Sequence, residues 1–159
     1  MSVDVRIAVE QPTEADAIAL IGESDRYSAL LYPPESRHTL DTEALRDRRV
    51  TFLVARIEGR AVGCGALVRT GTDYAEIKRM YVTASARGRR IGFRLLAALE
   101  AIARTEAMGA LRLETGIHNR AALALYEAAG YRRTGPFGAY RPDPLSVFMV
   151  KEFVPAASD

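Results

Sequence analysis

The sequence has no tryptophan, one cysteine and two histidines among its 159 residues. A single cysteine, Cys64, excludes an intramolecular disulfide and any metal site built from several cysteines. Cys64 lies within the apolar segment AVGCGALV, which favours a small buried residue. The histidines, His38 and His118, stand alone in loop segments, and no histidine–carboxylate cluster indicates a metal. We therefore expect no bound metal.

Long apolar runs and a targeting signal are also missing. No stretch approaches the ~18 apolar residues of a membrane-spanning helix. Residues 1–16 carry acidic side chains where a signal peptide needs an apolar core. The formal net charge is only +2, so overall charge identifies no partner. These absences predict a cytoplasmic protein that has no membrane partner.

Basic charge is instead concentrated in one segment. Between Ile77 and Leu99 there are six basic residues and no acidic ones, which leaves −4 for the rest of the chain because the total is +2. The densest part is RGRRIG, from Arg87 to Gly92. Like charges that are crowded together repel one another, so an anionic partner is expected there.

The hydrophobic pattern predicts one mixed α/β domain over residues 1–154, followed by a short tail at 155–159. Thr13 and Asp16 fit a capping box at the start of the first helix, and residues 27–39 are expected to be irregular. Strands are expected at 3–9, 51–57, 61–68, 75–82, 110–115, 131–133 and 145–153. Further helices are expected at 41–46, 91–108 and 119–129.

The RGRRIG loop follows an expected strand and opens an expected helix. Its backbone N–H groups therefore lie at the positive end of the helix dipole, where glycine permits close approach and arginine adds charge-assisted contacts. This placement favours phosphate binding over a solvated basic loop. A nucleic-acid-binding surface is the weaker alternative, since the cluster is one loop without interleaved aromatic residues.

Three segments in this order resemble the GNAT family, the Gcn5-related N-acetyltransferases. They are AEIKRMYV at 75–82, RGRRIG at 87–92 and ETGIHNRAALALYEAAGY at 114–131. Arg87 and Gly92 fill the first and last positions of the family's loop fingerprint, whereas Arg90 stands where the family has glycine. The resemblance extends from Thr51 onward; the first fifty residues agree only in the order of their elements.

The resemblance implies the GNAT acyl-CoA N-acyltransferase fold: a single central, mostly antiparallel sheet with splayed fourth and fifth strands and flanking helices. It also implies transfer of acetyl from acetyl-CoA to the primary amine of a small molecule or peptide, by direct attack in a ternary complex. A non-catalytic acyl-CoA-binding sensor of the same fold is the alternative. The turn-rich segment 135–144 could serve a homodimer.

The resemblance also assigns residues to the cofactor. The pantetheine arm would pair with the backbone of Met80, Tyr81 and Val82. The pyrophosphate would rest on the loop residues Arg87, Gly88, Arg89, Arg90, Ile91 and Gly92. Asn119 either contacts the cofactor or only caps its helix.

Two residues are candidates for the chemistry. Tyr126 matches the family tyrosine that protonates the leaving thiolate, and the alternative is an aromatic ring that only packs. Glu76 stands where some relatives carry the general base. Its alternative is an exposed carboxylate paired with Lys78 on the same face of the strand.

The acceptor is expected to meet the loop that closes over it in relatives. Its candidate residues are Tyr27, Tyr32, Glu35, Arg37 and Arg79. Glu35 could attract a cationic amine, and Arg37 or Arg79 could meet a carboxylate. An ordinary proline-rich surface loop is the alternative.

Overall fold

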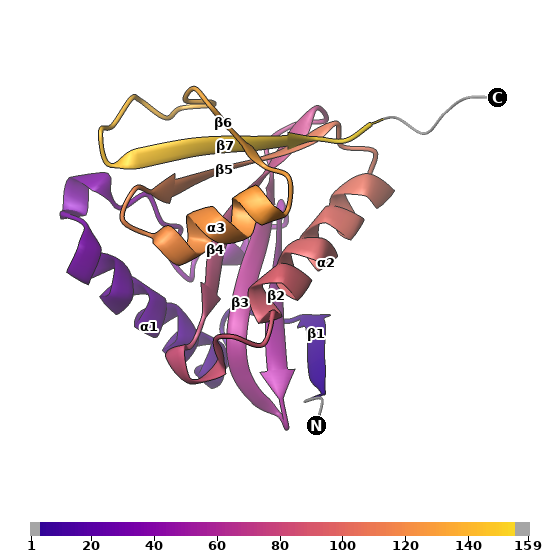
Figure 1. Ribbon diagram of the computed structural model, residues 1–159. Coiled ribbons are helices and arrows are strands. Elements are labelled where there is room, and N and C mark those ends of the chain that lie inside the picture. Colours follow the sequence, from indigo (N-terminus) through magenta and orange to yellow (C-terminus); the bar gives the residue numbers. More distant parts are fainter. Residues whose placement is uncertain (1–3, 155–159) are drawn as a thin grey trace.

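The computed structural model describes residues 4–154, which form a seven-stranded sheet flanked by three α-helices (Figure 1). The strand order across the sheet is β1-β2-β3-β4-β5-β7-β6. The strands are β1 (Val5–Val9), β2 (Val50–Ile57), β3 (Arg60–Arg69), β4 (Tyr74–Val82), β5 (Ala110–Gly116), β6 (Arg132–Thr134) and β7 (Ser146–Glu152). The helices are α1 (Ala15–Leu31), α2 (Ile91–Thr105) and α3 (Arg120–Ala128). Val3 and the expected tail at 155–159 lie outside the described residues.

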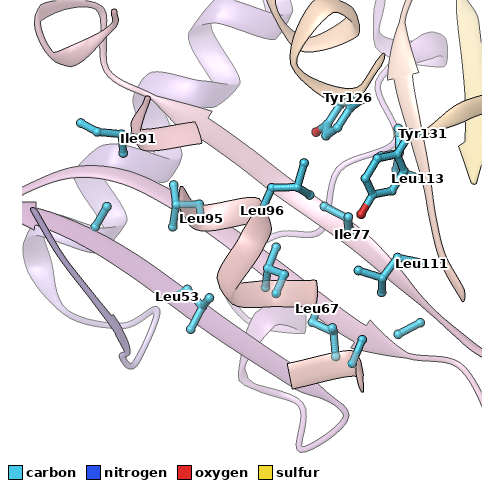
Figure 2. Close-up of a cluster of buried hydrophobic side chains, with 14 of the residues drawn as sticks. Leu53, Leu67, Ile77, Ile91, Leu95, Leu96, Leu111, Leu113, Tyr126 and Tyr131 are labelled. Carbon is cyan, nitrogen blue, oxygen red and sulfur yellow. The ribbon is translucent and has the colours of Figure 1, made fainter. Parts of the chain in front are cut away.

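Helices cover both faces of the sheet. Successive residues of β2 alternate between two apolar clusters: Phe52 and Val54 pack with α1, and Leu53 and Ala55 pack with α2. This alternation follows from the period of two along a strand. Figure 2 shows the larger cluster, in which the leucines of α2 meet side chains of the sheet. No helix within residues 4–154 is long and apolar enough to cross a membrane.

The sheet opens between its two parallel strands. Every neighbouring pair is antiparallel except β4 and β5, whose pairing ends at Ile77 and Leu113. Beyond this point β5 continues beside β7 as far as Gly116 and Ser146. The arm made of β5, β7 and β6 thus diverges from the rest of the sheet (Figure 1). The expected mostly antiparallel sheet with splayed strands is confirmed.

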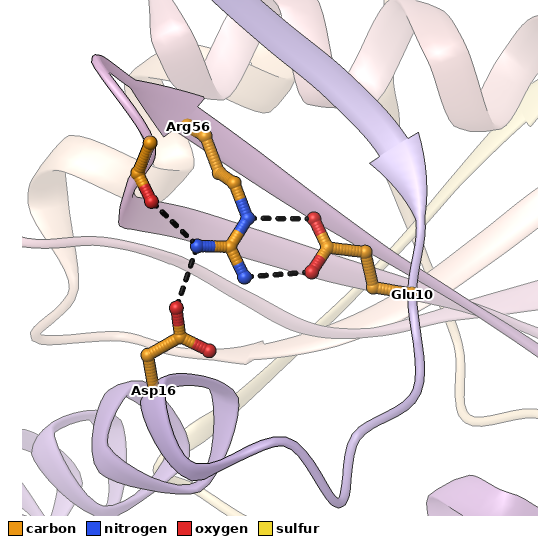
Figure 3. A network of polar contacts seen from close by, with 4 residues as sticks. Glu10, Asp16 and Arg56 are labelled. Atoms are coloured by element: carbon orange, nitrogen blue, oxygen red, sulfur yellow. Dashed lines mark hydrogen bonds and ion pairs between the residues drawn. The ribbon is translucent and has the colours of Figure 1, made fainter.

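The expected capping box at the start of α1 is wrong. The N-cap residue is Glu14, and its side chain makes no capping hydrogen bond. Asp16 instead accepts a hydrogen bond from Arg56 of β2 at 2.5 Å, and the same guanidinium donates to both oxygens of Glu10 (Figure 3). A tertiary ion pair has therefore replaced the local cap.

Two further elements differ from the sequence expectation. Helix α1 continues through Leu31, so residues 27–31 are helical rather than irregular. The expected helix at 41–46 is only a 3-10 turn at Ala44–Arg46. The Asp41 carboxylate accepts a hydrogen bond from the Ala44 N–H at 2.8 Å, which stabilises a turn without a following helix.

The C-terminus of α2 and the N-terminus of α3 test two further sequence expectations. Helix α2 ends three residues before the expected Met108, because Ala107 adopts a φ of 60° and the Met108 N–H donates back to Ala103. At the start of α3, the Asn119 side chain accepts from the Ala122 N–H at 3.3 Å. The expected cap is confirmed.

Candidate active site

A β-bulge bends β4 where it leaves β5. Cys64 of β3 pairs with Tyr81 and Ala66 pairs with Lys78, so two residues of β4 face one residue of β3. Arg79 takes the extra position with a φ of 59°, and its carbonyl accepts a hydrogen bond from the Cys64 thiol at 3.1 Å. Such bulges increase local twist and redirect strands. This bulge lies where β4 and β5 separate.

The separated part of β4 forms one wall of a cavity of about 450 Å³, called here the cofactor groove. Among residues 4–154, the β5 side of β4 has no strand partner beyond Ile77, so its backbone groups there are free to pair with a ligand. The groove runs to the N-terminus of α2. Nine of the expected cofactor residues line it: Met80, Tyr81, Val82, Arg87, Gly88, Arg90, Ile91, Gly92 and Asn119. Arg89 is exposed and does not line it.

The phosphate-binding character of the groove comes from the start of α2. The amides of Ile91, Gly92 and Phe93 belong to the first helical turn and have no carbonyl partner inside the helix. The Arg87 guanidinium lies over the Tyr27 ring, 5.3 Å from its centroid, and donates to the Val82 carbonyl at 3.1 Å. Backbone donors and a cation thus meet at one end of the groove.

Arg90 occupies the N-cap of α2 in the left-handed conformation, with φ 62° and ψ 23°. This conformation explains why relatives carry glycine there, since a side chain makes it less favourable by about 1–2 kcal/mol. The Arg90 side chain is exposed and its guanidinium lies 5.1 Å from the Phe93 ring centroid.

We expect Arg90→Gly to raise the free energy of unfolding by up to about 1 kcal/mol, because relief of the left-handed strain exceeds the added chain entropy. Chemical denaturation measures this change. Arg89→Gly is the matched control: it removes the same charge from a neighbouring exposed position whose φ is not positive. If the control is stabilised as much as Arg90→Gly, the conformational explanation is wrong.

A second, smaller cavity of about 120 Å³ joins the groove and is called here the acceptor pocket. Its walls come from α1, residues 36–39, both splayed strands and α3. Six residues line both cavities: Ser24, Ser28, Met80, Asn119, Ala122 and Tyr126. The two spaces therefore adjoin at Tyr126.

Tyr126 projects from α3 into this junction. Its ring packs edge-on against Tyr131, with centroids 5.8 Å apart, and the residue is 5% exposed. Figure 2 shows its hydroxyl directed away from Tyr131. Burial, and then the nearby Glu114, raise the pKa of the phenol above its ordinary value. At neutral pH the group therefore holds its proton and can donate it.

Glu114 is a pocket residue that the sequence reasoning did not select. It directly follows the last β5 residue paired with β4, and it lines the acceptor pocket together with Tyr126. Burial raises the pKa of its carboxyl group. The available signal was an acidic residue at the carboxyl end of the expected fifth strand, where the two strands part.

Glu76 does not line the acceptor pocket. Its carboxylate is 3.3 Å from the Lys78 ammonium and accepts a hydrogen bond from the Tyr140 hydroxyl. The ion pair with Lys78, which was the alternative to a role as general base, is therefore present. The carboxylate is buried, however, and not exposed as that alternative expected. Glu76 lines a neighbouring cavity of about 860 Å³ beside residues 137–143, which shares His38, Thr39 and Lys78 with the acceptor pocket, whereas Glu114 lines the pocket of Tyr126.

The expected acceptor residues are only partly brought together. Tyr32, Arg37 and Arg79 line the acceptor pocket, Tyr27 lines the cofactor groove, and Glu35 lines the neighbouring cavity near Glu76. The Arg79 side chain is 2% exposed and donates to Asp25 at 2.6 Å and to the Leu40 carbonyl at 2.7 Å. It therefore holds residue 40 against α1.

Tyr32 closes the end of the pocket over Gly116. Its hydroxyl accepts a hydrogen bond from the His118 N–H at 3.0 Å, and its ring stacks on the His118 imidazole. A Cβ at Gly116 would lie 1.8 Å from the Tyr32 hydroxyl oxygen. Glycine is thus required for this close approach.

We expect Gly116→Ala to raise KM for the acceptor at least about tenfold, because the displaced Tyr32 ring no longer shapes the pocket. Acetyl-CoA affinity should change little, since neither residue lines the cofactor groove. Steady-state kinetics with acceptor and cofactor varied separately measure both effects. Gly135→Ala is the control, because a Cβ there meets nothing within 4 Å. An unchanged acceptor KM would refute the packing argument.

Comparison with known proteins agrees with this geometry. The model of the acetyltransferase (GNAT) family matches residues 19–131. The IAA acetyltransferase of Azospirillum brasilense is 48% identical over 93% of this chain and 97% of its own length. A Klebsiella pneumoniae structure assigned as an acyl-CoA N-acyltransferase is 42% identical, with a TM-score of 0.79 over 93% of this chain and 97% of its own. The PaiA N-acetyltransferase of Thermoplasma acidophilum, solved with coenzyme A, is 20% identical with a TM-score of 0.77 over 94% and 99%.

The fold and the two joined cavities define an acyltransferase-type site. The chain belongs to the GNAT family. It is an N-acetyltransferase, and the relatives favour this over an acyl-CoA sensor or a nucleic-acid-binding module. Within residues 4–154, no group of three or more histidine, cysteine, aspartate or glutamate side chains is placed to hold a metal ion.

Proposed function

We propose that the protein transfers the acetyl group of acetyl-CoA to the primary amine of a small acceptor, by direct attack in a ternary complex. The observation that carries the proposal is that the cofactor groove and the acceptor pocket adjoin and share Tyr126. Because two cavities meet at this tyrosine, there is room for both substrates at once. Acetyl-CoA supplies the thioester carbonyl that the amine attacks.

The groove has the features that a CoA-type ligand requires. The free backbone edge of Met80–Val82 offers amide and carbonyl partners for the pantetheine arm. The amides of Ile91 and Gly92 and the guanidinium of Arg87 would hold the pyrophosphate. The same fold carries coenzyme A in the Thermoplasma acidophilum relative. The residues present therefore fit the cofactor.

Two pocket residues would carry out the proton transfers of the reaction. The acceptor amine must be neutral to attack, and Glu114 is the carboxylate placed in the pocket to remove its proton, directly or through water. Tyr126 would donate its phenolic proton to the leaving thiolate. Glu76, bonded to Lys78 and Tyr140 beside another cavity, would act only by positioning those groups.

A covalent acetyl-enzyme does not suit this site. Cys64, the only cysteine of the chain, is buried, and burial raises the pKa of its thiol to about 12. A thiol of that pKa is a poor nucleophile at neutral pH. Its hydrogen bond to the Arg79 carbonyl gives it a structural role in the bulge.

Acetyl-CoA binding and initial-velocity kinetics test the proposal. Calorimetry should detect acetyl-CoA binding, and a thiol reagent should detect CoA release that requires an amine. Double-reciprocal plots at several acceptor concentrations should intersect, as expected when both substrates bind before chemistry. Parallel lines, which indicate a covalent intermediate, or a failure to bind acetyl-CoA would refute the proposal. A homodimer through residues 135–144 and a cytoplasmic location stay predictions.

A further inference from the structure

Three lysine and arginine side chains line the acceptor pocket, and they differ in how they are paired. Lys78 lies 3.3 Å from Glu76, and Arg79 lies 2.6 Å from Asp25. Arg37 takes part in none of the ion pairs formed among residues 4–154. The residue is partly buried, and its Nε atom is enclosed by protein without a hydrogen-bond partner among the described residues. The pocket thus holds one arginine that has no anionic partner.

A charged group that is partly removed from water without a partner is unfavourable. The two terminal nitrogens of a guanidinium form a planar fork that matches the two oxygens of a carboxylate. Within residues 4–154, no carboxylate is paired with Arg37. Asp143 accepts from the Ser36 hydroxyl at 2.9 Å and lies 3.7 Å from His38, and the pocket's own carboxylate, Glu114, is in none of these ion pairs. A ligand can therefore supply the matching group.

The rest of the pocket limits what that ligand is. Its volume of about 120 Å³ is well below the ~300–1,000 Å³ of drug-sized sites, so the part of the acceptor that it holds is small. Glu114 and Tyr126, the proposed proton-transfer groups, line the same small space as Arg37. A bound acceptor therefore has its amine and its anionic group only a few atoms apart.

We infer that the acceptor is a small amino carboxylate, whose carboxylate is bound by Arg37 while its amine faces Glu114 and Tyr126. This inference rests on the proposed acetyl transfer and names its acceptor class. In an N-terminal peptide amine the adjacent backbone carboxyl group has become an amide, so it leaves Arg37 without an anionic partner. Simple alkylamines and polyamines carry no carboxylate, so they also leave Arg37 unpaired.

Matched acceptor pairs test the inference. Glycine, alanine and β-alanine are each compared with their carboxamides, in the wild type and in Arg37→Gln. The wild type should acetylate the acids. Arg37→Gln should lower kcat/KM for the acids by roughly tenfold to 100-fold, mainly through KM, and leave the amides nearly unchanged. The variant-to-wild-type ratio cancels the different basicity of each acid and amide.

Two control variants accompany Arg37→Gln. Arg37→Lys keeps the charge but loses the planar fork, so it should recover only part of the activity on the acids. Glu35→Gln alters an exposed residue of the same loop that lines the other cavity, and it should leave the acid preference intact. Equal losses on acids and amides in Arg37→Gln would show a structural role and overturn the inference.

A binding measurement separates this inference from the proposed function. Glycine, alanine and β-alanine are titrated into the CoA-loaded protein and followed by NMR, for the wild type and Arg37→Gln. If no amine is acetylated but the acids bind in an Arg37-dependent way, the acetyl-transfer proposal fails and carboxylate recognition stands. If amides or peptides are acetylated and the acids neither bind nor react, the inference is overturned and acetyl transfer stands.

Discussion

Tyr126→Phe should lower kcat at least about 100-fold, because we propose that the buried phenol protonates the leaving thiolate. The phenylalanine ring keeps the packing against Tyr131, so the fold should be preserved. The dissociation constant for CoA should change little, since backbone and loop groups provide most of the groove. Single-turnover kinetics and calorimetry measure the two effects independently.

Tyr131→Phe is the matched control. This tyrosine belongs to the same apolar cluster, and its hydroxyl donates to Glu100 at 3.4 Å rather than facing the junction of the cavities. Its loss should affect stability slightly and leave kcat within a few-fold of the wild type. If Tyr126→Phe retains full turnover, the Tyr126 ring has only a packing role, which is the alternative given in the sequence analysis.

Glu114→Gln should lower kcat by about 100-fold and change the pH profile. A base must be deprotonated to accept a proton, so activity falls as the pH falls through its pKa. Because burial raises the pKa of Glu114, the acid limb of the wild-type kcat profile should lie above the ordinary glutamate range. Glutamine cannot titrate, and that limb should disappear in the variant. Profiles of kcat at saturating substrates measure this.

Glu76→Gln makes the same chemical change outside the Tyr126 pocket and is the control. We expect it to weaken the contacts with Lys78 and Tyr140 and to preserve the acid limb. If Glu76→Gln removes the limb and Glu114→Gln keeps it, the two carboxylates have been assigned in the wrong order. The variants thus distinguish Glu76, the base expected from the sequence, from Glu114, the base that we propose.

Stability gives a second readout for Glu114. Its folded-state pKa is raised, so the folded protein binds the proton more tightly than the unfolded chain does. Stability therefore declines as the pH rises through the raised pKa. Glu114→Gln removes this decline, and the variant should be at least as stable as the wild type at neutral pH. A loss of turnover in a stable variant is then a loss of chemistry.

The sequence alone determined the parts of the protein that depend on neighbouring residues. The strand at 75–82, the loop from Arg87 to Gly92 and the helix that follows it are local patterns, and they were predicted nearly in place. The Asn119 cap is equally local, because donor and acceptor are three residues apart. The left-handed conformation of Arg90 is also a local feature. The sequence showed that Arg90 replaces the family's glycine, and the structure supplies the backbone conformation that favours glycine there.

Only the tertiary structure decided which side chains share a cavity. Asp16 bonds to Arg56, forty residues away, instead of joining a local cap, and Glu76 is drawn into a network with Tyr140. Glu114 enters the pocket of Tyr126 because the two strands stop pairing just before it. Such outcomes depend on partners distant in sequence, whose attraction competes with local preference and often exceeds it. The sequence therefore predicted the fold and the cofactor groove, whereas the acceptor pocket and its base required the assembled sheet.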